Sequence, residues 1–433
     1  MLSAADNELL TRTGAGTAMG ELFQRFWQPV LLSKEVPEPD GPPVRVTVFG
    51  QSLVAFRDTD GRVGLVDPRC PHRGANLFFG RNEACGLRCA YHGWKFDVDG
   101  RCVDMPTMPP ESGFRDKVRI TAYPTREWGD FVWAYLGPAG TEPPLPDLEF
   151  ARLPAAHRFV SKKLQQCNWA QACEGALDTA HFSFLHMPVW SGDAAVDAAV
   201  SRSSVDRERT RWMRDDPRPE FDVVMHDVGF VAGGARRATG DARYWRIAQF
   251  LMPNHALTPN AFPGENIHGQ AWVPIGDEAC WVYCYTWNPD RPLTEDERRA
   301  FRAGRTVHAA VDAQWVPVRN RDNDYLIDRV AQQQRSYTGI EGVSEQDAMI
   351  QDSQGLVADR TREHLGPTDA AIIEFRRMIL RAARELRGGV EPAAPRASAA
   401  YRVRGGSIVA DRHLSFAEVM VKRFGHPLGL VTD

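Results

Sequence analysis

Residues 70–94 read CPHRGANLFFGRNEACGLRCAYHGW, and this stretch decides the fold of the N-terminal half of the chain. It holds two short pairs, Cys70-x-His72 and Cys89-x-x-His92, with sixteen residues between them. Two thiols and two imidazoles at such spacings, each inside a turn-rich segment, indicate metal ligands. The identity of the metal then determines how the rest of the chain is interpreted.

Each of the two pairs contributes one cysteine and one histidine. A structural zinc site also takes Cys₂His₂, but zinc fingers place both cysteines in one pair and both histidines in the other. The mixed arrangement fits a Rieske [2Fe–2S] cluster, in which two cysteines bind one iron and two histidines bind the other. We therefore expect Cys70, His72, Cys89 and His92 to hold a Rieske cluster, with zinc as the alternative.

Composition limits the class of protein. A chain of 433 residues with 43% hydrophobic and 25% charged residues is an ordinary globular protein, long enough for two or three domains. Its net charge of -4 gives no general attraction to nucleic acid or to anionic membranes. No long apolar run or signal-peptide pattern is visible, and eight cysteines are too sparse for a secreted disulfide framework. We expect a cytoplasmic protein that binds neither nucleic acid nor membranes.

Three segments differ in their residue pattern. Residues 1–43 begin with a short helical segment. Residues 44–147 alternate apolar and polar residues between turn signals, as short strands do, and end in a stretch rich in Pro and Gly. Residues 148–433 combine several such strands with amphipathic helices. We expect an α+β protein, in which an all-β domain with the cluster precedes a larger α+β domain with an antiparallel sheet.

A second group of metal-ligand residues lies in NWAQACEGALDTAHFSFLH at 168–186. If this segment is mostly helical, Glu174, Asp178 and His181 share one face of the helix. His186 follows five residues later and is able to turn back onto the same metal. Two histidines with one carboxylate from elsewhere form the facial triad of non-haem Fe(II) oxygenases. The alternative is a helix whose polar residues are satisfied at a subunit or domain contact.

The chain resembles a known family over nearly its whole length. Residues 70–106 resemble the Rieske domain of bacterial Rieske non-haem iron oxygenases, whose cluster motif is highly specific. The segment 168–186 and the opening segment DNELLTRTGAGTAMGELFQRFWQPV are similar to the phthalate dioxygenase-like group of that family. This resemblance implies a helix-grip, START-like fold for the second domain. It also implies that His181 and His186 bind a mononuclear Fe(II).

Two further site residues follow from the same resemblance. Asp178 would bridge, through hydrogen bonds, to a cluster-ligand histidine of the neighbouring subunit, which implies a homotrimer or two stacked trimers forming a hexamer. The third iron ligand would be an acid in the helix SEQDAMIQDSQG. Asp347 fits the family pattern, and Asp352 is the second choice. The alternative is that both are solvated helix acids.

The resemblance also implies the reaction and the partners. A Rieske cluster moves single electrons, and the chain has no dinucleotide fingerprint or second cluster motif. Electrons would therefore come from a separate NAD(P)H-dependent reductase that carries flavin and its own [2Fe–2S] cluster. The expected reaction is the O₂-dependent cis-dihydroxylation of a small aromatic carboxylate, of the phthalate or chlorobenzoate type, in aromatic catabolism. Monooxygenation or O-demethylation of an aromatic acid or aryl ether remains open. An electron-transfer metalloprotein without oxygenase activity is the alternative from a different class.

A buried substrate carboxylate needs a cationic partner, and arginine offers a bidentate one. Arg207 alternates with two other arginines in VDRERTRW, which we interpret as a strand with one face toward the pocket. Arg246 lies in another expected strand, and Thr179 and Ser183 flank the first iron-binding histidine. We expect these four residues to contact substrate, and the alternative for the arginines is a solvated surface position.

Overall fold

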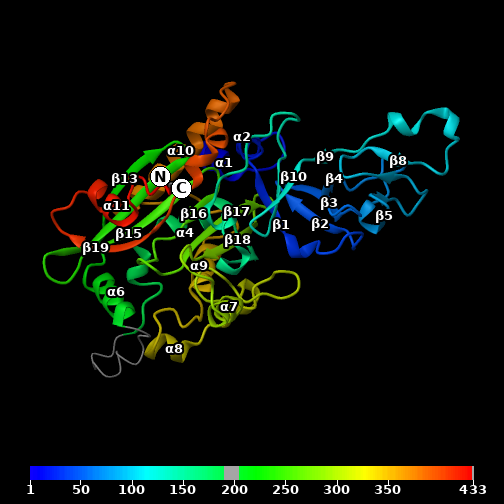
Figure 1. Ribbon diagram of the computed structural model, residues 1–433. Helices are drawn as coiled ribbons and strands as arrows, with labels where there is room; N and C mark the ends of the chain where they lie inside the picture. Colours follow the sequence, from blue (N-terminus) through cyan, green and yellow to red (C-terminus); the bar gives the residue numbers. More distant parts are fainter. Residues whose placement is uncertain (190–203, 432–433) are drawn as a thin grey trace.

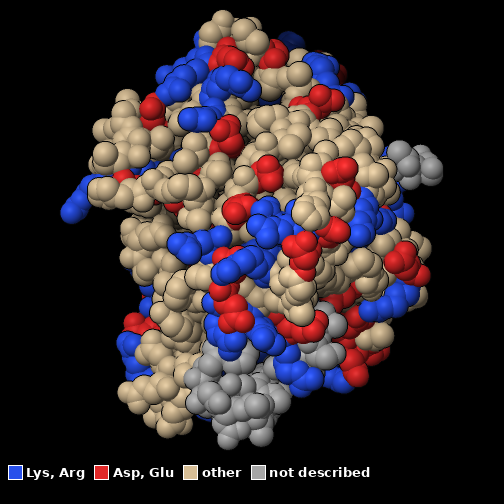
Figure 2. Space-filling view, turned by 90° about the vertical axis from the view of Figure 1, so that its left-hand side faces the viewer, with Lys and Arg blue, Asp and Glu red and all other residues tan. Residues whose placement is uncertain are grey.

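The computed structural model of this chain describes residues 1–189 and 204–431. A β-rich region lies at one end, and a larger region of helices on an extended sheet lies at the other (Figure 1). The expected α+β class is therefore confirmed. Acidic and basic side chains are mixed over the face that Figure 2 shows. None of the helices in the described ranges is long and apolar enough to cross a membrane.

Two small antiparallel sheets form the β-rich region, with strand orders β2-β3-β4-β9 and β5-β6-β7-β8. The strands are β2 (Val44–Val48), β3 (Gln51–Arg57), β4 (Val63–Val66), β5 (Arg81–Glu83), β6 (Gly86–Arg88), β7 (Lys95–Phe96), β8 (Cys102–Asp104) and β9 (Ala122–Tyr123). Phe56, Leu87 and Phe96 are fully buried in a small core that both sheets share. Cys70 and Cys89 belong to that core, so it supports the two cluster loops.

A third sheet, in the order β1-β11-β10, joins the two regions. Its strands are β1 (Gln28–Leu32), β10 (Thr125–Trp128) and β11 (Phe131–Ala134), and the helices α1 (Ala4–Thr11) and α2 (Ala18–Phe23) precede it. The ring of Phe131 packs edge-on against Tyr283 of the larger sheet, with 5.5 Å between centroids. We propose that the chain divides into residues 1–43, 44–147 and 148–433. Strand β1 of the first segment pairs with β11 of the second.

An eight-stranded antiparallel sheet forms the centre of the larger region, in the order β12-β18-β17-β16-β15-β14-β13, with β19 beside β15. Its strands are β12 (Arg158–Gln165), β13 (Glu220–His226), β14 (Gly229–Arg237), β15 (Ala242–Leu251), β16 (His255–Leu257), β17 (Ile267–Pro274), β18 (Cys280–Trp287) and β19 (Gly406–Asp411). The central strands are buried along nearly all of their length. Both faces of the sheet are therefore covered.

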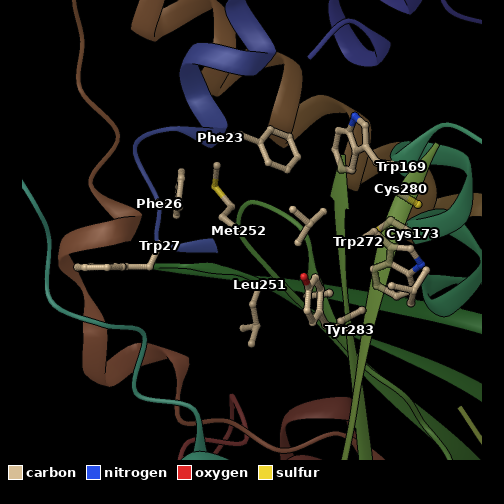
Figure 3. Packing of buried hydrophobic residues seen from close by; sticks show 14 of the residues in the cluster. Phe23, Phe26, Trp27, Trp169, Cys173, Leu251, Met252, Trp272, Cys280 and Tyr283 are labelled. Carbon is tan, nitrogen blue, oxygen red and sulfur yellow. The ribbon is translucent and has the colours of Figure 1, made fainter. Parts of the chain in front are cut away.

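Helices cover the sheet and carry the site. They are α3 (Glu149–Arg152), α4 (Trp169–Leu177), α6 (Ser204–Asp215), α7 (Glu295–Arg302), α8 (Arg329–Gln334), α9 (Val343–Ser353), α10 (Ala370–Arg387) and α11 (Phe416–Phe424). Helix α4 packs across β15, β16 and β17, and α10 packs on α1, α2 and α4. Figure 3 shows Trp169 of α4 beside Phe23 of α2, with ring centroids 4.8 Å apart. These contacts fix the segment that leads to Asp178.

The segment 168–186 departs from the single long helix that its sequence predicts. Helix α4 ends before Asp178, which has an extended conformation (φ -84°, ψ 113°). Oδ1 of Asp178 accepts the N–H of Ala180 at 2.6 Å, a local bond that competes with helical continuation. His181 therefore begins a separate short 3₁₀ helix, η6 (His181–Ser183), so the prediction of one helix face shared with Glu174 was wrong.

Residues 205–212, which we expected to form a strand, belong to helix α6. Arginine and glutamate favour helices over strands, and Arg211 pairs with Asp215 four residues later at 3.4 Å. The spacing of the arginines at every second position is therefore a result of the high arginine content of the segment, and it does not indicate a strand. Arg207 consequently does not lie on a strand that faces the pocket.

Candidate functional site: two metal centres and a pocket

The two cluster loops have the same backbone hydrogen-bond pattern. In each loop the cysteine N–H donates to the carbonyl of the fifth residue after it, at 2.8 Å in both cases. The N–H of Gly74 then donates to the carbonyl of Cys70 at 2.9 Å, and that of Gly93 donates to Cys89 at 3.0 Å. Both glycines have a left-handed φ, +75° and +78°, which residues with a Cβ rarely adopt. The loops therefore present their cysteines in equivalent ways.

The four predicted cluster ligands lie together at the tips of these loops. Cys70 and Cys89 are buried, and the imidazole rings of His72 and His92 are 4.4 Å apart between centroids. Trp94 stacks on His72 at 4.4 Å and 12°, which fixes the orientation of that ring. The sequence pattern did not identify this contact, because it depends on how the two loops meet.

The donor atoms fit an iron–sulfur cluster. Nδ1 of His72 is buried without a hydrogen-bond partner, as expected for an atom that binds a metal. Burial raises the pKa of the Cys70 thiol to about 11, so a bound cation is needed to hold it as a thiolate at neutral pH. The donor set therefore matches the predicted [2Fe–2S] ligands.

Three ligand atoms of the second centre converge. Nε2 of His181 lies 3.1 Å from Nε2 of His186, and Oδ1 of Asp347 lies 3.6 Å and 3.2 Å from these two nitrogens. In an octahedral site with bonds of about 2.1 Å, adjacent ligand atoms are about 3 Å apart. The described residues thus bring together two histidines and one carboxylate at the spacing of a facial triad.

The alternative acid, Asp352, lies outside this group. It follows Asp347 by five residues on α9, which places it about 140° further around the helix. Asp352 is buried and accepts a hydrogen bond from the hydroxyl of Tyr325. Glu174 is also not a ligand candidate, because it is buried between Arg360 and Arg376, which it pairs with at 3.3 Å and 2.8 Å.

Each histidine of the triad has a partner for its other ring nitrogen. Nδ1 of His186 donates to Oε1 of Gln346 at 2.7 Å, and the amide nitrogen of Gln346 donates to the carbonyl of Ile340 at 2.8 Å. Nδ1 of His181 lies 3.4 Å from Oδ2 of Asp178. Such partners orient metal-binding imidazoles and fix their tautomers. Gln346 had no signal in the sequence, whereas Asp178 was identified by resemblance.

The Asp178 carboxylate faces an open groove. Burial raises its pKa, but the hydrogen bond and attraction from His181 outweigh that effect and lower the pKa below its usual value. Its side chain remains 23% exposed, so a group outside this chain is able to reach it. The groove is lined by Asp178 and His181 together with Leu185 and Ile350. One side of the triad is therefore accessible from the protein surface.

A pocket opens on another side of Asp347. It holds only about 40 Å³, enough for a few water molecules or a carboxylate group, and its walls include Phe182, Trp272, Asn260 and Lys163. A second, more open pocket shares Phe182 and Asn260 with it and also reaches His186. This second pocket, of about 690 Å³, has a size suitable for a small aromatic acid and leads from the surface to His186 of the triad.

Arg246 and Thr179, both predicted to contact substrate, bind each other behind the pocket wall. Nε of Arg246 donates to Oγ1 of Thr179 at 2.7 Å, and its Nη2 donates to Oδ1 of Asn260 at 2.6 Å. The guanidinium lies 3.8 Å from the centroid of the Phe182 ring. Since Phe182 and Asn260 line both pockets, the charge of Arg246 lies directly behind the pocket surface.

Arg207 and Ser183, the other two residues predicted to contact substrate, do not line either pocket. Arg207 is exposed on α6 and lines neither pocket. Arg209, two residues later, lines the second pocket and pairs with Glu265 at 3.1 Å. Ser183 is buried but is not part of either pocket wall. The helix, with its period of 3.6 residues, turns Arg209 toward the pocket and leaves Arg207 outside.

Comparisons with known proteins show the family of this chain. Residues 26–124 match the Rieske [2Fe–2S] domain, and residues 134–404 match the family described as LigXa C-terminal domain like. The phthalate 4,5-dioxygenase oxygenase subunit of Pseudomonas putida is 42% identical, over 90% of this chain and 88% of its own length. The 3-chlorobenzoate-3,4-dioxygenase oxygenase subunit of Comamonas testosteroni is 36% identical, over 98% of this chain and 99% of its own.

Solved structures support the fold. Dicamba monooxygenase bound to dicamba superposes with a TM-score of 0.58, at 17% identity, and covers 85% of this chain and 99% of its own. Because two family matches and two relatives together span the chain, the alternative of a pure electron-transfer metalloprotein is excluded.

Proposed function

The chain belongs to the Rieske non-haem iron oxygenases, with a [2Fe–2S] cluster and a mononuclear iron, and we propose that it cis-dihydroxylates a small aromatic carboxylate of the phthalate or chlorobenzoate type. The single observation that carries this proposal is the position of the triad. His186 borders a pocket of suitable size, and His181 and Asp347 border a groove that contains Asp178.

We assign the cluster to Cys70, His72, Cys89 and His92, and the mononuclear iron to the triad. When bound, the iron supplies the site of O₂ activation and the cluster supplies single electrons. His181, His186 and Asp347 would hold the iron, and the pocket that reaches His186 would admit the substrate beside it.

The pocket walls suit an aromatic acid. Phe182, which lines both pockets, provides flat apolar surface for a ring. The guanidinium of Arg246, behind Phe182 and Asn260, provides positive charge close to a carboxylate in the pocket. Thr179 orients Arg246, and we retain both as substrate-site residues, Thr179 as a positioning residue.

We propose that Asp178 is an electron-transfer bridge between subunits. Its partly exposed carboxylate lies 3.4 Å from His181, and Phe184, three residues after His181, is 53% exposed. At the other end of the molecule, Tyr91 is 55% exposed and its ring lies 3.9 Å from that of His92. Exposed aromatic groups beside both centres are consistent with docking of one subunit's cluster loops against the groove of the next. We propose a homotrimer, or two stacked trimers, on this basis.

We further propose that electrons come from a separate NAD(P)H-dependent reductase with flavin and a [2Fe–2S] domain, in the cytoplasm. The two relatives are named oxygenase subunits, which supports a system with more than one component. The sequence itself has no dinucleotide-binding fingerprint.

Product analysis tests the proposed function. The protein is supplied with a reductase of this type, NADH, O₂ and separate samples of phthalate, 3-chlorobenzoate, benzoate and methoxybenzoates. A cis-dihydrodiol from phthalate or chlorobenzoate is the expected product. Formaldehyde from a methoxybenzoate, without any dihydrodiol, would replace the proposal by O-demethylation. Coupled oxidation of NADH without any organic product from this panel would reject the substrate class.

A further inference from the structure

Two neighbouring lysines of β12 point to opposite faces of the sheet, as alternate strand residues do. Lys162 donates to Oε2 of Glu35 at 2.7 Å, so its charge is compensated. Lys163 points toward α9, where Nζ donates to Oγ and to the carbonyl oxygen of Ser344 at 2.5 Å and 3.2 Å. Both lysines are buried, with 3% and 4% of their surface exposed.

Lys163 has no acidic partner in direct contact. Within residues 1–189 and 204–431, no carboxylate oxygen lies within 4.0 Å of its Nζ. Its charge acts on Glu345, Asp347 and Asp352 only over longer distances. Each of the three arginines that line the neighbouring pocket forms an ion pair. Arg209 pairs with Glu265 at 3.1 Å, Arg291 with Glu297 at 2.7 Å, and Arg305 with Glu341 at 3.2 Å. Glu345, Asp347 and Asp352 compensate the buried lysine charge only from a distance, and an anionic partner in direct contact would stabilise the ammonium further.

The Lys163 ammonium lies at the wall of the pocket beside Asp347. Ser344 accepts from it through two oxygens, and an ammonium has three hydrogens to donate, so one remains for another acceptor. Arg246, another buried cation of this site without a carboxylate within 4.0 Å in the described ranges, belongs to a different strand, β15. The pocket therefore meets positive charge from two separate positions.

We propose that Lys163 binds a second anionic group of a substrate whose ring lies in the larger neighbouring pocket, so that the site selects aromatic acids with two anionic groups over those with one. The inference rests on the proposed function and narrows its substrate class. Phthalate carries two carboxylates and chlorobenzoate carries one. Lys163 therefore favours a phthalate-like substrate, with one carboxylate near Arg246 and the other on the ammonium.

Equilibrium binding tests this role without catalysis. Calorimetry measures the affinity of the full-length protein, with both metal centres loaded and no reductant, for phthalate and for benzoate. In Lys163→Gln, which keeps a donor for Ser344 but removes the charge, phthalate affinity should fall at least tenfold and benzoate affinity less than twofold. Lys163→Arg should restore most of the preference for phthalate, because it restores the charge.

Lys162→Gln is the matched control, because it removes a buried charge from the opposite face of the same strand. Its phthalate-to-benzoate affinity ratio should equal that of the wild type. The Rieske EPR signal and the iron content of every variant verify that the fold is intact. If Lys163→Gln misfolds, Lys163→Arg alone tests the inference. The ratio of its phthalate affinity to its benzoate affinity should stay above ten. A ratio near one would overturn the inference.

The outcomes separate this inference from the proposed function. If the wild type oxygenates an aromatic acid but Lys163→Gln keeps the wild-type affinity ratio, the role of Lys163 is wrong and the proposed function stands. If the wild type neither binds nor oxygenates any aromatic acid, the proposed function fails and the role of Lys163 fails with it.

Discussion

Nδ1 of His186 donates to Oε1 of Gln346 at 2.7 Å, and this bond determines which nitrogen of the ring faces the iron site. The amide of Gln346 is held by its own bond to the carbonyl of Ile340, so its oxygen points at the ring. An amide oxygen only accepts, so Nδ1 carries the proton and the lone pair of Nε2 faces His181 and Asp347.

Removal of this bond should weaken the mononuclear site. Gln346→Leu leaves the tautomer and orientation of His186 unfixed, so we expect iron affinity to fall about 10- to 100-fold. Gln346→Glu, which keeps an acceptor, should retain iron within a few-fold of the wild type. Titration of the iron-depleted protein with Fe(II) measures both affinities, and equal affinity in Gln346→Leu and the wild type would contradict the assigned role.

The choice between two acids of α9 is also testable. Asp347→Asn should reduce iron from three atoms per chain to two, with acid-labile sulfide unchanged at two, because only the mononuclear site loses a charged ligand. Asp352→Asn should keep all three, since Asp352 bonds Tyr325 and lies away from the histidines. Loss of iron in Asp352→Asn alone would reverse the assignment.

Asp178→Asn should separate metal binding from electron transfer. The amide keeps the size of the side chain but loses the charge that polarises His181. We expect near-normal iron content and cluster reduction, with oxidation of the cluster by O₂ and substrate slowed by orders of magnitude in stopped-flow measurements.

A mixed assembly extends the Asp178 test to the subunit arrangement. Chains with Asp178→Asn and chains with Cys70→Ser, which lack the cluster, are co-expressed with different tags. Doubly tagged oligomers should regain activity that neither parent shows, because the cluster of one chain then faces an intact Asp178 on the next. Inactive mixed oligomers would rule out transfer between subunits.

Glu297 gives the protein a pH-dependent contribution to stability. Arg291, as the strongest influence, and the capping bonds with Thr294 lower the pKa of Glu297 from 4.5 to about 2. Because the folded-state pKa is depressed, the stabilisation is complete above pH 4.5 and is lost as the pH falls toward 2. Melting temperatures of Glu297→Gln and the wild type should differ most at neutral pH and converge below pH 4.5. A constant difference across that range would show that the ionisation of Glu297 does not matter.

Local patterns predicted the parts of the site that depend on local spacing. The cluster ligands were identifiable because the two residues of each pair lie in one short loop. The alternation of apolar and polar residues predicted the strands of the sheets. The sequence pattern did not predict where α4 ends, because one hydrogen bond from the N–H of Ala180 to the Asp178 side chain stops the helix. Helix α6 was mistaken for a strand because its arginines happen to alternate.

Other site residues depend on contacts between distant segments. Gln346 matters only because α9 places it against His186, 160 positions earlier in the chain. Lys163 and Lys162 look equivalent in the sequence, and only the structure shows that Lys162 contacts a carboxylate directly, that of Glu35. The position of Asp347 came from resemblance, and the structure supplies the distances that place it beside both histidines.

A single-turnover experiment with labelled oxygen tests the central claim most directly. The protein with both centres loaded and reduced is mixed with phthalate and ¹⁸O₂, and the product is analysed by mass spectrometry. The account predicts a cis-dihydrodiol that contains two ¹⁸O atoms from one O₂ molecule. A product with a single ¹⁸O atom, or full oxidation of the reduced cluster without any labelled product, would contradict it.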